Sequence, residues 1–171
     1  MPGNLAVAIA VANQPGAVVP DRYMTRSAMS SGIPLTWNPS RPDFDDHLAR
    51  LILEEVLAVR HYYEGDFYPL TRITADEDCW LAYQYDRPDL GEGIIMAFRR
   101  PMALERSIVV RLEGLDPGTA YELKNLDSGE RRTATGKELC AQLRLTSESK
   151  PQSLLFTYKR RNTGIRSPGH G

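Results

Sequence analysis

The sequence predicts an α+β fold that is mainly β, with one long helix followed by an antiparallel β-sandwich of about eight strands. Two observations carry this prediction. Apolar residues recur every three or four positions between residues 43 and 64, and short β-rich runs separated by turn signals fill most of the chain after Gly65. With 171 residues, the chain has room for one ordinary domain and part of another, but not for two full domains.

The long helix is predicted over Asp43–Glu64. It should begin after Pro42, where acidic side chains favour the positive end of the helix dipole, and end near Gly65. Further apolar residues widen its apolar surface beyond one stripe, so we expect the helix to be covered on more than one side. The periodic positions are Phe44, Leu48, Leu51, Ile52, Val59, Tyr62 and Tyr63, and the additional ones are Leu53, Val56, Leu57 and Ala58.

Eight runs after the helix have the composition of strands, and Pro or Gly in the segments between several of them favours tight turns. The runs are FYPLTR, CWLAYQY, GIIMAFR, SIVVRL, TAYELKN, RRTAT, QLRLT and SLLFTYK. Tyr121 follows one of these turns directly, as in the tyrosine corner of Greek-key sandwiches, where the ring packs inward and the hydroxyl bonds to upstream backbone. Gly136–Leu139 can add a single helical turn.

Three regions are expected along the chain, namely residues 1–64, the sandwich of residues 65–160 and a disordered basic tail of residues 161–171. Closely spaced Pro and Gly predict an irregular stretch over residues 1–24. Arg26–Gly32 can form one or two helical turns, and Ile33–Asn38 has strand character.

Composition argues against several classes of protein. The 21 Lys and Arg nearly balance the 22 Asp and Glu, so we expect neither nucleic acid nor a membrane as a partner. The apolar run Leu5–Ala12 is too short to cross a bilayer, and it lacks the preceding positive charge of a secretory signal. Cys79 and Cys140 have no neighbours at metal-ligand spacing, so we expect two buried thiols and no metal or other cofactor.

No catalytic residue is predicted in this chain. A glycosidase needs two carboxyl groups about 5–9.5 Å apart. The densest acidic cluster, Asp76–Asp78, lies between two predicted strands and is best explained as a polar loop, and Asp43–Asp46 suits a helix N-terminus. The sequence contains no Gly-rich phosphate loop and no Ser-His-Asp ordering.

Aromatic side chains are the candidates for sugar binding, because sugars stack their C–H faces on aromatic rings. Most of them lie on alternating strand positions or on the apolar helix face, which favours a place in the core; these are Tyr62, Tyr63, Phe67, Tyr68, Trp80, Tyr83 and Tyr85. Trp37 and Asn38 differ, because an apolar strand that ends in Trp-Asn is typical of the C-terminal rim of a parallel barrel, where active sites are built. We therefore predict Trp37 and Asn38 as substrate-binding residues.

Four stretches of the sequence resemble the C-terminal portion of melibiase-type α-galactosidases, in the glycoside hydrolase clan that includes family 36. They are RSAMSSGIPLTWN, HYYEGDFYPLTR, DCWLAYQYDRPDLGEGIIMAFRRP and RLEGLDPGTAYELKNLDSGE, and the similarity covers residues 22 to 160 or so. In that family a (β/α)8 barrel performs retaining hydrolysis with two aspartates, and a C-terminal antiparallel sandwich packs against the barrel.

The resemblance implies that residues 1–64 hold the remnant of a (β/α)8 barrel. Arg26–Asn38 would be its last strand region, with Arg26 as a further substrate-binding residue, and Asp43–Glu64 would be its last helix. The family's catalytic aspartates lie in earlier barrel strands, and no segment here matches them. Because a whole barrel takes about 250 residues, we expect a C-terminal fragment without a complete catalytic centre.

Three functions stay open at this point. The first is a C-terminal piece of an α-galactosidase-like hydrolase, whose sandwich supports a barrel supplied by another polypeptide or now lost. The second is a stand-alone carbohydrate-binding module that uses exposed aromatic residues such as Trp80 or Trp37. The third is a structural interaction domain in which the apolar helix mediates assembly, for example into a homo-oligomer. Sugar specificity, oligomeric state and compartment do not follow from the sequence.

Overall fold

The computed structural model describes residues 18–29 and 36–161. Within these ranges the helices are α2 (Arg22–Ala28), α3 (Asp46–Val59) and α4 (Gly136–Ala141), and the 3-10 helix η1 (Arg60–Glu64) extends α3. None of the described helices is long and apolar enough to span a membrane.

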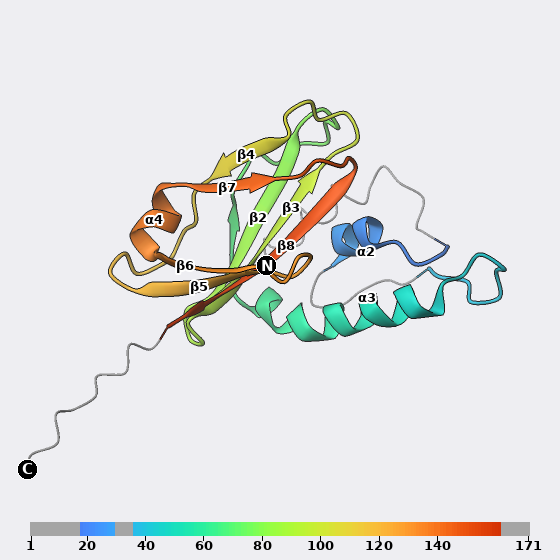
Figure 1. Ribbon diagram of the computed structural model, residues 1–171, viewed down its shortest axis with the longest axis horizontal. Helices are drawn as coiled ribbons and strands as arrows, with labels where there is room; N and C mark the ends of the chain where they lie inside the picture. Colours follow the sequence, from blue (N-terminus) through green and yellow to red (C-terminus); the bar gives the residue numbers. More distant parts are fainter. Residues whose placement is uncertain (1–17, 30–35, 162–171) are drawn as a thin grey trace, which may run out of the picture.

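The strands form two antiparallel sheets (Figure 1). The larger sheet has six strands in the order β1-β2-β3-β8-β5-β6, and the smaller one consists of β4 and β7. Their bounds are β1 (Asp66–Pro69), β2 (Trp80–Arg87), β3 (Glu92–Arg99), β4 (Ser107–Val110), β5 (Ala120–Asn125), β6 (Arg131–Thr135), β7 (Leu143–Thr146) and β8 (Gln152–Arg160). Each run predicted from the sequence overlaps one of these strands, so the prediction of a mainly β, antiparallel fold is confirmed.

Both faces of the large sheet are covered by other elements. Successive residues of its central strands point to opposite faces, so each strand contributes side chains to two separate cores. On one face Trp80 and Ile95 pack into a core that includes the small sheet and α4. On the other face Tyr83 and Met96 pack into a second core with Ile52 of α3. Figure 1 shows the resulting three layers, with α2 and α3 on one side of the large sheet and β4, β7 and α4 on the other.

The long helix is shorter than predicted at both ends. Asp45 caps α3 by accepting a hydrogen bond from the Leu48 N–H at 2.8 Å, whereas Asp43 precedes the helix and forms an ion pair with Arg41. After Val59 the chain tightens into η1, so that Glu64 ends the helical segment as predicted but in 3-10 geometry.

Only one face of α3 is buried within the described part of the chain. The buried side chains are those of Ala49, Ile52, Val56 and Val59. Leu51, Leu53 and Leu57 are 38%, 37% and 59% exposed. The expectation that the helix is covered on more than one side is therefore not met by this chain alone.

The segment before α3 departs from the prediction in two ways. The helix α2 begins inside the stretch expected to be irregular, because Asp21 caps it by accepting a hydrogen bond from the Met24 N–H at 2.7 Å. Thr36–Asn38 is not a strand. Of its backbone groups, the Asn38 N–H donates to the Val18 carbonyl at 2.8 Å, and the chain then turns.

Several predictions concern residues outside the described ranges. These are the apolar run within residues 1–17, the first half of the predicted strand at residues 33–35, and the tail at residues 162–171. Within the described residues, a remnant of a (β/α)8 barrel is not shown, since every paired strand is antiparallel.

The tyrosine corner is confirmed. Tyr121 is 3% exposed, and its hydroxyl oxygen accepts a hydrogen bond from the Asp116 N–H at 3.1 Å. The interaction fixes the turn before β5, so that this strand enters the sheet at a defined register beside β8.

Candidate functional site

A buried arginine ties the helical layer to the large sheet. Arg26 of α2 donates to both carboxylate oxygens of Glu55 on α3, each at 2.7 Å, and its Nη2 lies 2.7 Å from Oδ1 of Asp127 in the β5–β6 turn. Its Nη1 donates to the Ser153 carbonyl of β8 at 3.2 Å. One side chain therefore links two helices to two parts of the sheet.

The contacts of Arg26 also fix its charge. Burial by itself lowers the pKa of this guanidinium, but the hydrogen bonds to Glu55 and Asp127 outweigh burial and raise the pKa. Arg26 has no exposed surface. The observed contacts give it a structural role, and its predicted contact with a sugar stays a prediction.

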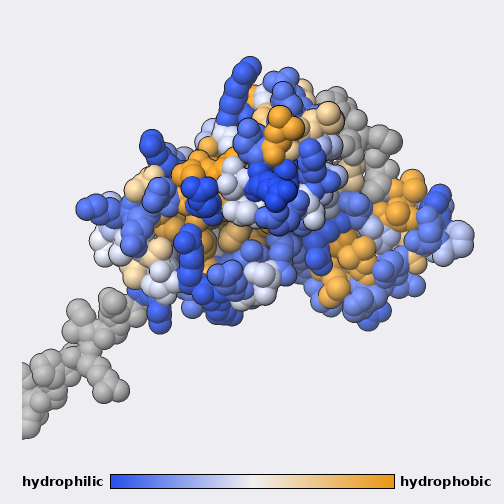
Figure 2. Space-filling view, turned by 45° about the horizontal axis from the view of Figure 1, so that its top comes forward, coloured by the Kyte–Doolittle hydropathy of each residue, from blue (hydrophilic) through white to orange (hydrophobic). Residues whose placement is uncertain are grey.

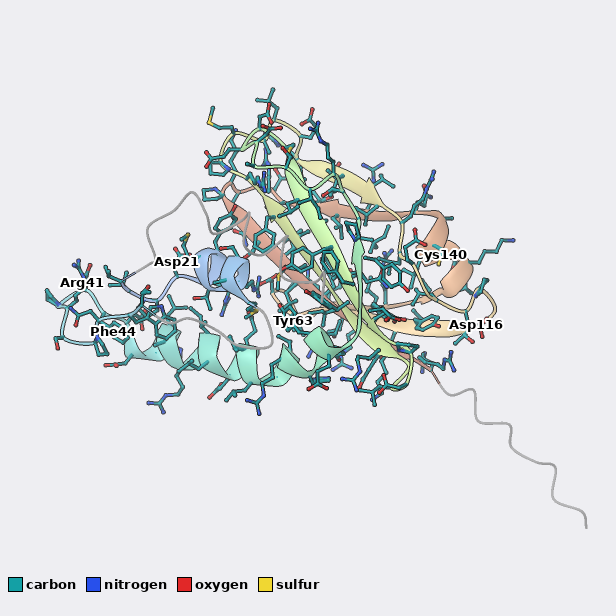
Figure 3. The ribbon with its side chains drawn as sticks, turned by 180° about the vertical axis from the view of Figure 1, so that it is seen from behind. Asp21, Arg41, Phe44, Tyr63, Asp116 and Cys140 are labelled. Atoms are coloured by element: carbon teal, nitrogen blue, oxygen red, sulfur yellow. The ribbon has the colours of Figure 1, made fainter. Side chains whose placement is uncertain are left out.

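Trp37 and Asn38 lie in the loop that leads to α3. The Trp37 ring is half-buried and meets the Phe44 ring edge-on, with centroids 6.2 Å apart. Asn38 is exposed, and its side-chain oxygen accepts a hydrogen bond from the Ser40 N–H at 3.1 Å. Figure 3 shows Phe44 at the end of α3 that points away from the β-sheets. The polar group available to a ligand here is the Asn38 amide.

In the described part of the chain, Arg26 makes its hydrogen bonds and ion pairs with Glu55, Asp127 and Ser153 and none with this loop. Arg26 faces inward between α2, α3 and the sheet, whereas Asn38 faces solvent. The three predicted substrate-binding residues therefore do not form one cluster of side chains in this structure, and their shared role stays untested.

Most of the aromatic candidates belong to the core beneath the helices. Tyr83 and Tyr85 are buried, and the Tyr63 ring stacks edge-on against Tyr85 with centroids 4.8 Å apart. Burial raises the pKa of Tyr62 and of Tyr85 to about 12. These phenols stay neutral at physiological pH and serve packing, as the sequence analysis expected.

Trp80 is also buried, with 4% of its surface exposed, and its indole N–H donates to the Glu105 carbonyl at 2.8 Å. The second hypothesis took Trp80 as an exposed aromatic residue. That premise is wrong, because alternation along β2 turns Trp80 into the core between the two sheets. Only its edge reaches a surface hollow, which also involves the β1–β2 loop.

Asp86 is the one buried carboxyl group among the described residues. Burial raises its pKa, while the Tyr158 hydroxyl, which donates to Asp86 Oδ1 at 2.6 Å, works in the opposite direction. The Tyr158 oxygen in turn accepts from the Gln84 amide at 2.8 Å. A raised pKa is one property of a catalytic acid, but this group is closed off beneath Gly114, and the network has a structural role.

This buried polar network was not predicted from the sequence. A signal for it is nevertheless present, because Gln84 and Asp86 stand at alternate positions of an otherwise apolar and aromatic strand. Two polar residues on one face of a buried strand need hydrogen-bond partners. The partner Tyr158, 72 positions beyond Asp86, could not be identified from spacing alone.

The acidic loop Asp76–Asp78 is exposed, as expected for a polar loop. Among the described residues no group of His, Cys, Asp and Glu is arranged to hold a metal ion. Cys79 and Cys140 are free thiols, but each is partly exposed, so the expectation that both are buried is wrong. Both lie at the edges of elements, Cys79 just before β2 and Cys140 near the end of α4.

The helix α3 exposes large apolar side chains. Figure 2 shows apolar surface on the part of the molecule formed by the helices, at the lower right of the view. Leu53 and Leu57 are exposed and four positions apart, so they lie together on one side of α3, whereas the exposed Leu51 lies on the opposite side of the helix. We call Leu53 and Leu57 the leucine face, and we take it as the candidate functional surface because adjacent exposed apolar side chains can mark a contact site.

Comparison with solved structures identifies the fold. The galactosidase domain of an α-galactosidase-sucrose kinase superposes with a TM-score of 0.65 and 23% identity over 87% of this chain and 21% of that one. The α-galactosidase AgaA of Geobacillus stearothermophilus, in complex with raffinose, gives 0.67 and 20% over 91% of this chain and 24% of that one. This chain has the fold of one part of a family 36 α-galactosidase.

Other α-galactosidases agree with this result. AgaB of Geobacillus stearothermophilus gives a TM-score of 0.64 and 25% identity over 87% of this chain and 20% of that one. No protein-family model and no curated protein matches the sequence. The resemblance read from the sequence is thus confirmed at the level of the fold, and the chain spans between a fifth and a quarter of these α-galactosidases.

Proposed function

We propose that this chain is the C-terminal part of an α-galactosidase-like glycoside hydrolase, in which the sandwich is an accessory or structural domain and no complete catalytic centre is present. The single observation that carries the proposal is the structural match, which takes in 87–91% of this chain but only 20–24% of each α-galactosidase. A domain with this relation to an enzyme adds stability or binding surface, while the catalytic groups lie in the remainder.

The leucine face supports the proposal. The inner face of α3 packs on the large sheet, while Leu53 and Leu57, four positions apart, stand together on its outer side. In an enzyme of this family, the barrel is the body that would cover them. Burying a leucine side chain completely contributes about 1.5–3 kcal/mol, so covering these half-exposed residues would contribute a useful part of that amount each.

A barrel that covers α3 would also lie near Trp37 and Asn38, the proposed substrate contacts. Trp37 and Asn38 lie in the loop before α3, on the same layer of the molecule as the leucine face. If the barrel covers α3, the exposed Asn38 amide would stand at the junction of the two bodies, where a sugar hydroxyl could reach it. Arg26 would then act behind the junction by holding α2 and α3 together.

The proposal is tested with the purified chain and an aryl α-galactoside. We expect no release of the aryl group above that of buffer, because a glycosidase needs a pair of carboxyl groups and the one buried carboxyl group among the described residues, that of Asp86, is 4% exposed and bonded to Tyr158. Hydrolysis at an ordinary enzymatic turnover, roughly 1 per second or more, would show a complete catalytic centre and end the proposal. Asp86→Asn is the matched control, since it should leave any trace activity unchanged.

In the interaction-domain hypothesis, a second copy of this chain covers the leucine face in place of the barrel. Without a barrel, the leucine face of one molecule could meet that of a second copy. The carbohydrate-binding hypothesis no longer rests on an exposed Trp80, because this residue is buried.

A further inference from the structure

An open hollow lies between the β1–β2 loop and β4. Its volume is about 460 Å³, within the range of about 300–1,000 Å³ that small-molecule sites occupy. The apolar part of its lining, which we call the floor, comes from Cys79, Ile108 and the small exposed part of Trp80. Around that floor stand polar side chains, and the full lining is Thr71, Arg72, Thr74, Asp76, Asp78, Cys79, Trp80, Glu105 and Ile108.

The walls of the hollow are fixed by hydrogen bonds on both sides. The Thr71 hydroxyl accepts from the Ala82 N–H at 2.9 Å, which fastens the β1–β2 loop to β2. The backbone carbonyl of Asp76 accepts from the Arg100 guanidinium, and the Trp80 indole bridges to Glu105 on the opposite wall at 2.8 Å. A hollow with fixed walls binds a ligand without first losing loop entropy.

The rim offers donors and acceptors that the protein itself does not use. Arg72 and Asp78 have no hydrogen-bond or ion-pair partner among the described residues. Asp76 is oriented by the Thr74 hydroxyl, which donates to its Oδ2 at 2.6 Å, so that Oδ1 stays available. A guanidinium supplies paired N–H donors, and a carboxylate accepts from hydroxyl groups.

This combination selects a class of ligand. A pyranose ring has an apolar C–H face that suits the floor and hydroxyl groups that both donate and accept at the rim. With at least two carboxylates and one guanidinium around it, the hollow disfavours phosphates and other anions. We propose that this hollow binds one pyranose unit of a neutral saccharide. The inference goes beyond the proposed function and does not depend on it, because the hollow lies on the sandwich and shares no residue with α3.

The two tryptophans provide an internally controlled test, since the protein has one indole in the hollow and one outside it. We would titrate the 15N-labelled protein with methyl α-D-galactopyranoside and follow the two indole N–H signals by NMR, with Trp37→Phe to assign them. The Trp80 signal should shift and saturate with a Kd of about 1–10 mM, as for other open small sites. The Trp37 signal should stay in place.

Matched variants make the result specific. Arg72→Ala should weaken binding at least about ten-fold, since one charge-assisted hydrogen bond contributes about 1.5–3 kcal/mol. Arg132→Ala, another exposed arginine that lines a separate hollow between β6 and β7, should bind as tightly as the wild type. Glycerol, which has hydroxyl groups but no ring, should give no saturating shift.

Three outcomes overturn the inference. The first is a Trp80 signal that does not saturate with galactoside or glucoside, although the rest of the spectrum shows a folded protein. The second is equal binding by the Arg72 and Arg132 variants. The third is a saturating shift of Trp37 instead of Trp80, which would place the sugar at the Trp37–Asn38 loop. None of these results would contradict the proposed accessory role, because that role rests on the structural match and on the leucine face.

Discussion

The two faces of the large sheet are covered in different ways. Toward the small sheet, Ile95, Leu145 and Leu154 are almost wholly buried, and the buried polar groups on this side, those of Gln84 and Asp86, are hydrogen-bonded to Tyr158. Toward the helices, the apolar core is joined by the ion cluster around Arg26, and α3 exposes Leu53 and Leu57 on one side. The sandwich side therefore depends on an apolar core with a buried hydrogen-bond network, while the helical side depends on a buried ion cluster and leaves the leucine face uncovered.

The largest effect expected from this difference concerns the ion cluster. Arg26→Met should lower the free energy of unfolding by about 3–5 kcal/mol, because it leaves the Glu55 and Asp127 carboxylates largely buried without their partner. Urea unfolding followed by circular dichroism would measure the loss.

Arg22→Met is the matched control for that experiment. Arg22 approaches the same carboxylate of Glu55, but at 3.9 Å and with 39% of its side chain exposed. An exposed pair contributes about 0–1 kcal/mol, so this variant should stay close to the wild type. Equal effects of the two variants would show that the helical layer does not depend on the buried cluster.

A smaller effect is expected on the sandwich side. Tyr121→Phe removes the hydroxyl that accepts from the Asp116 N–H and keeps the ring in the core. The loss should be about 0.5–1.5 kcal/mol, the net contribution of one hydrogen bond. If thermal unfolding gave the same midpoint for this variant and the wild type, the Tyr121 hydroxyl would add nothing to stability and only the packing of the ring would matter.

The smallest effect is a pH dependence centred on Asp86. Its folded-state pKa is raised by burial, so the folded protein favours the protonated acid. The contribution of this group to stability is therefore fully present at low pH and is lost as the pH rises through the raised pKa. Relative to Asp86→Asn, the wild type should gain stability as the pH falls from 7 toward 4.5. A difference between the two proteins that does not vary with pH would contradict the assignment.

The sandwich could be predicted almost strand by strand, because each strand is a short local run bounded by turn residues. The helix boundaries shifted by a few residues, since Asp43, Asp45 and Asp46 could each have capped α3 and only the structure shows that Asp45 does. The seven residues of α2 are too few for a periodic signal.

The contacts that hold the layers together could not be predicted from the sequence. The hydrogen-bond partners of Arg26 lie 29 and 127 positions further along the chain, so no local sequence pattern indicates its role. The hollow beside Trp80 has the same property, because its lining comes from the β1–β2 loop, Glu105 and β4. The expected strand at Ile33–Asn38 was predicted from a short apolar run, and in the described residues no parallel strand is present to pair with its second half.

The most direct test of the central claim is the solution mass of the wild type and of Leu53→Glu/Leu57→Glu, measured by light scattering over a wide range of protein concentration. Without a barrel to cover the leucine face, the wild type should associate as concentration rises, and the double variant should stay monomeric. Leu90→Glu, which changes a 46% exposed leucine in the β2–β3 turn, should behave like the wild type. A wild type that stays monomeric throughout, or a Leu90 variant that dissociates as fully as the double variant, would contradict the account.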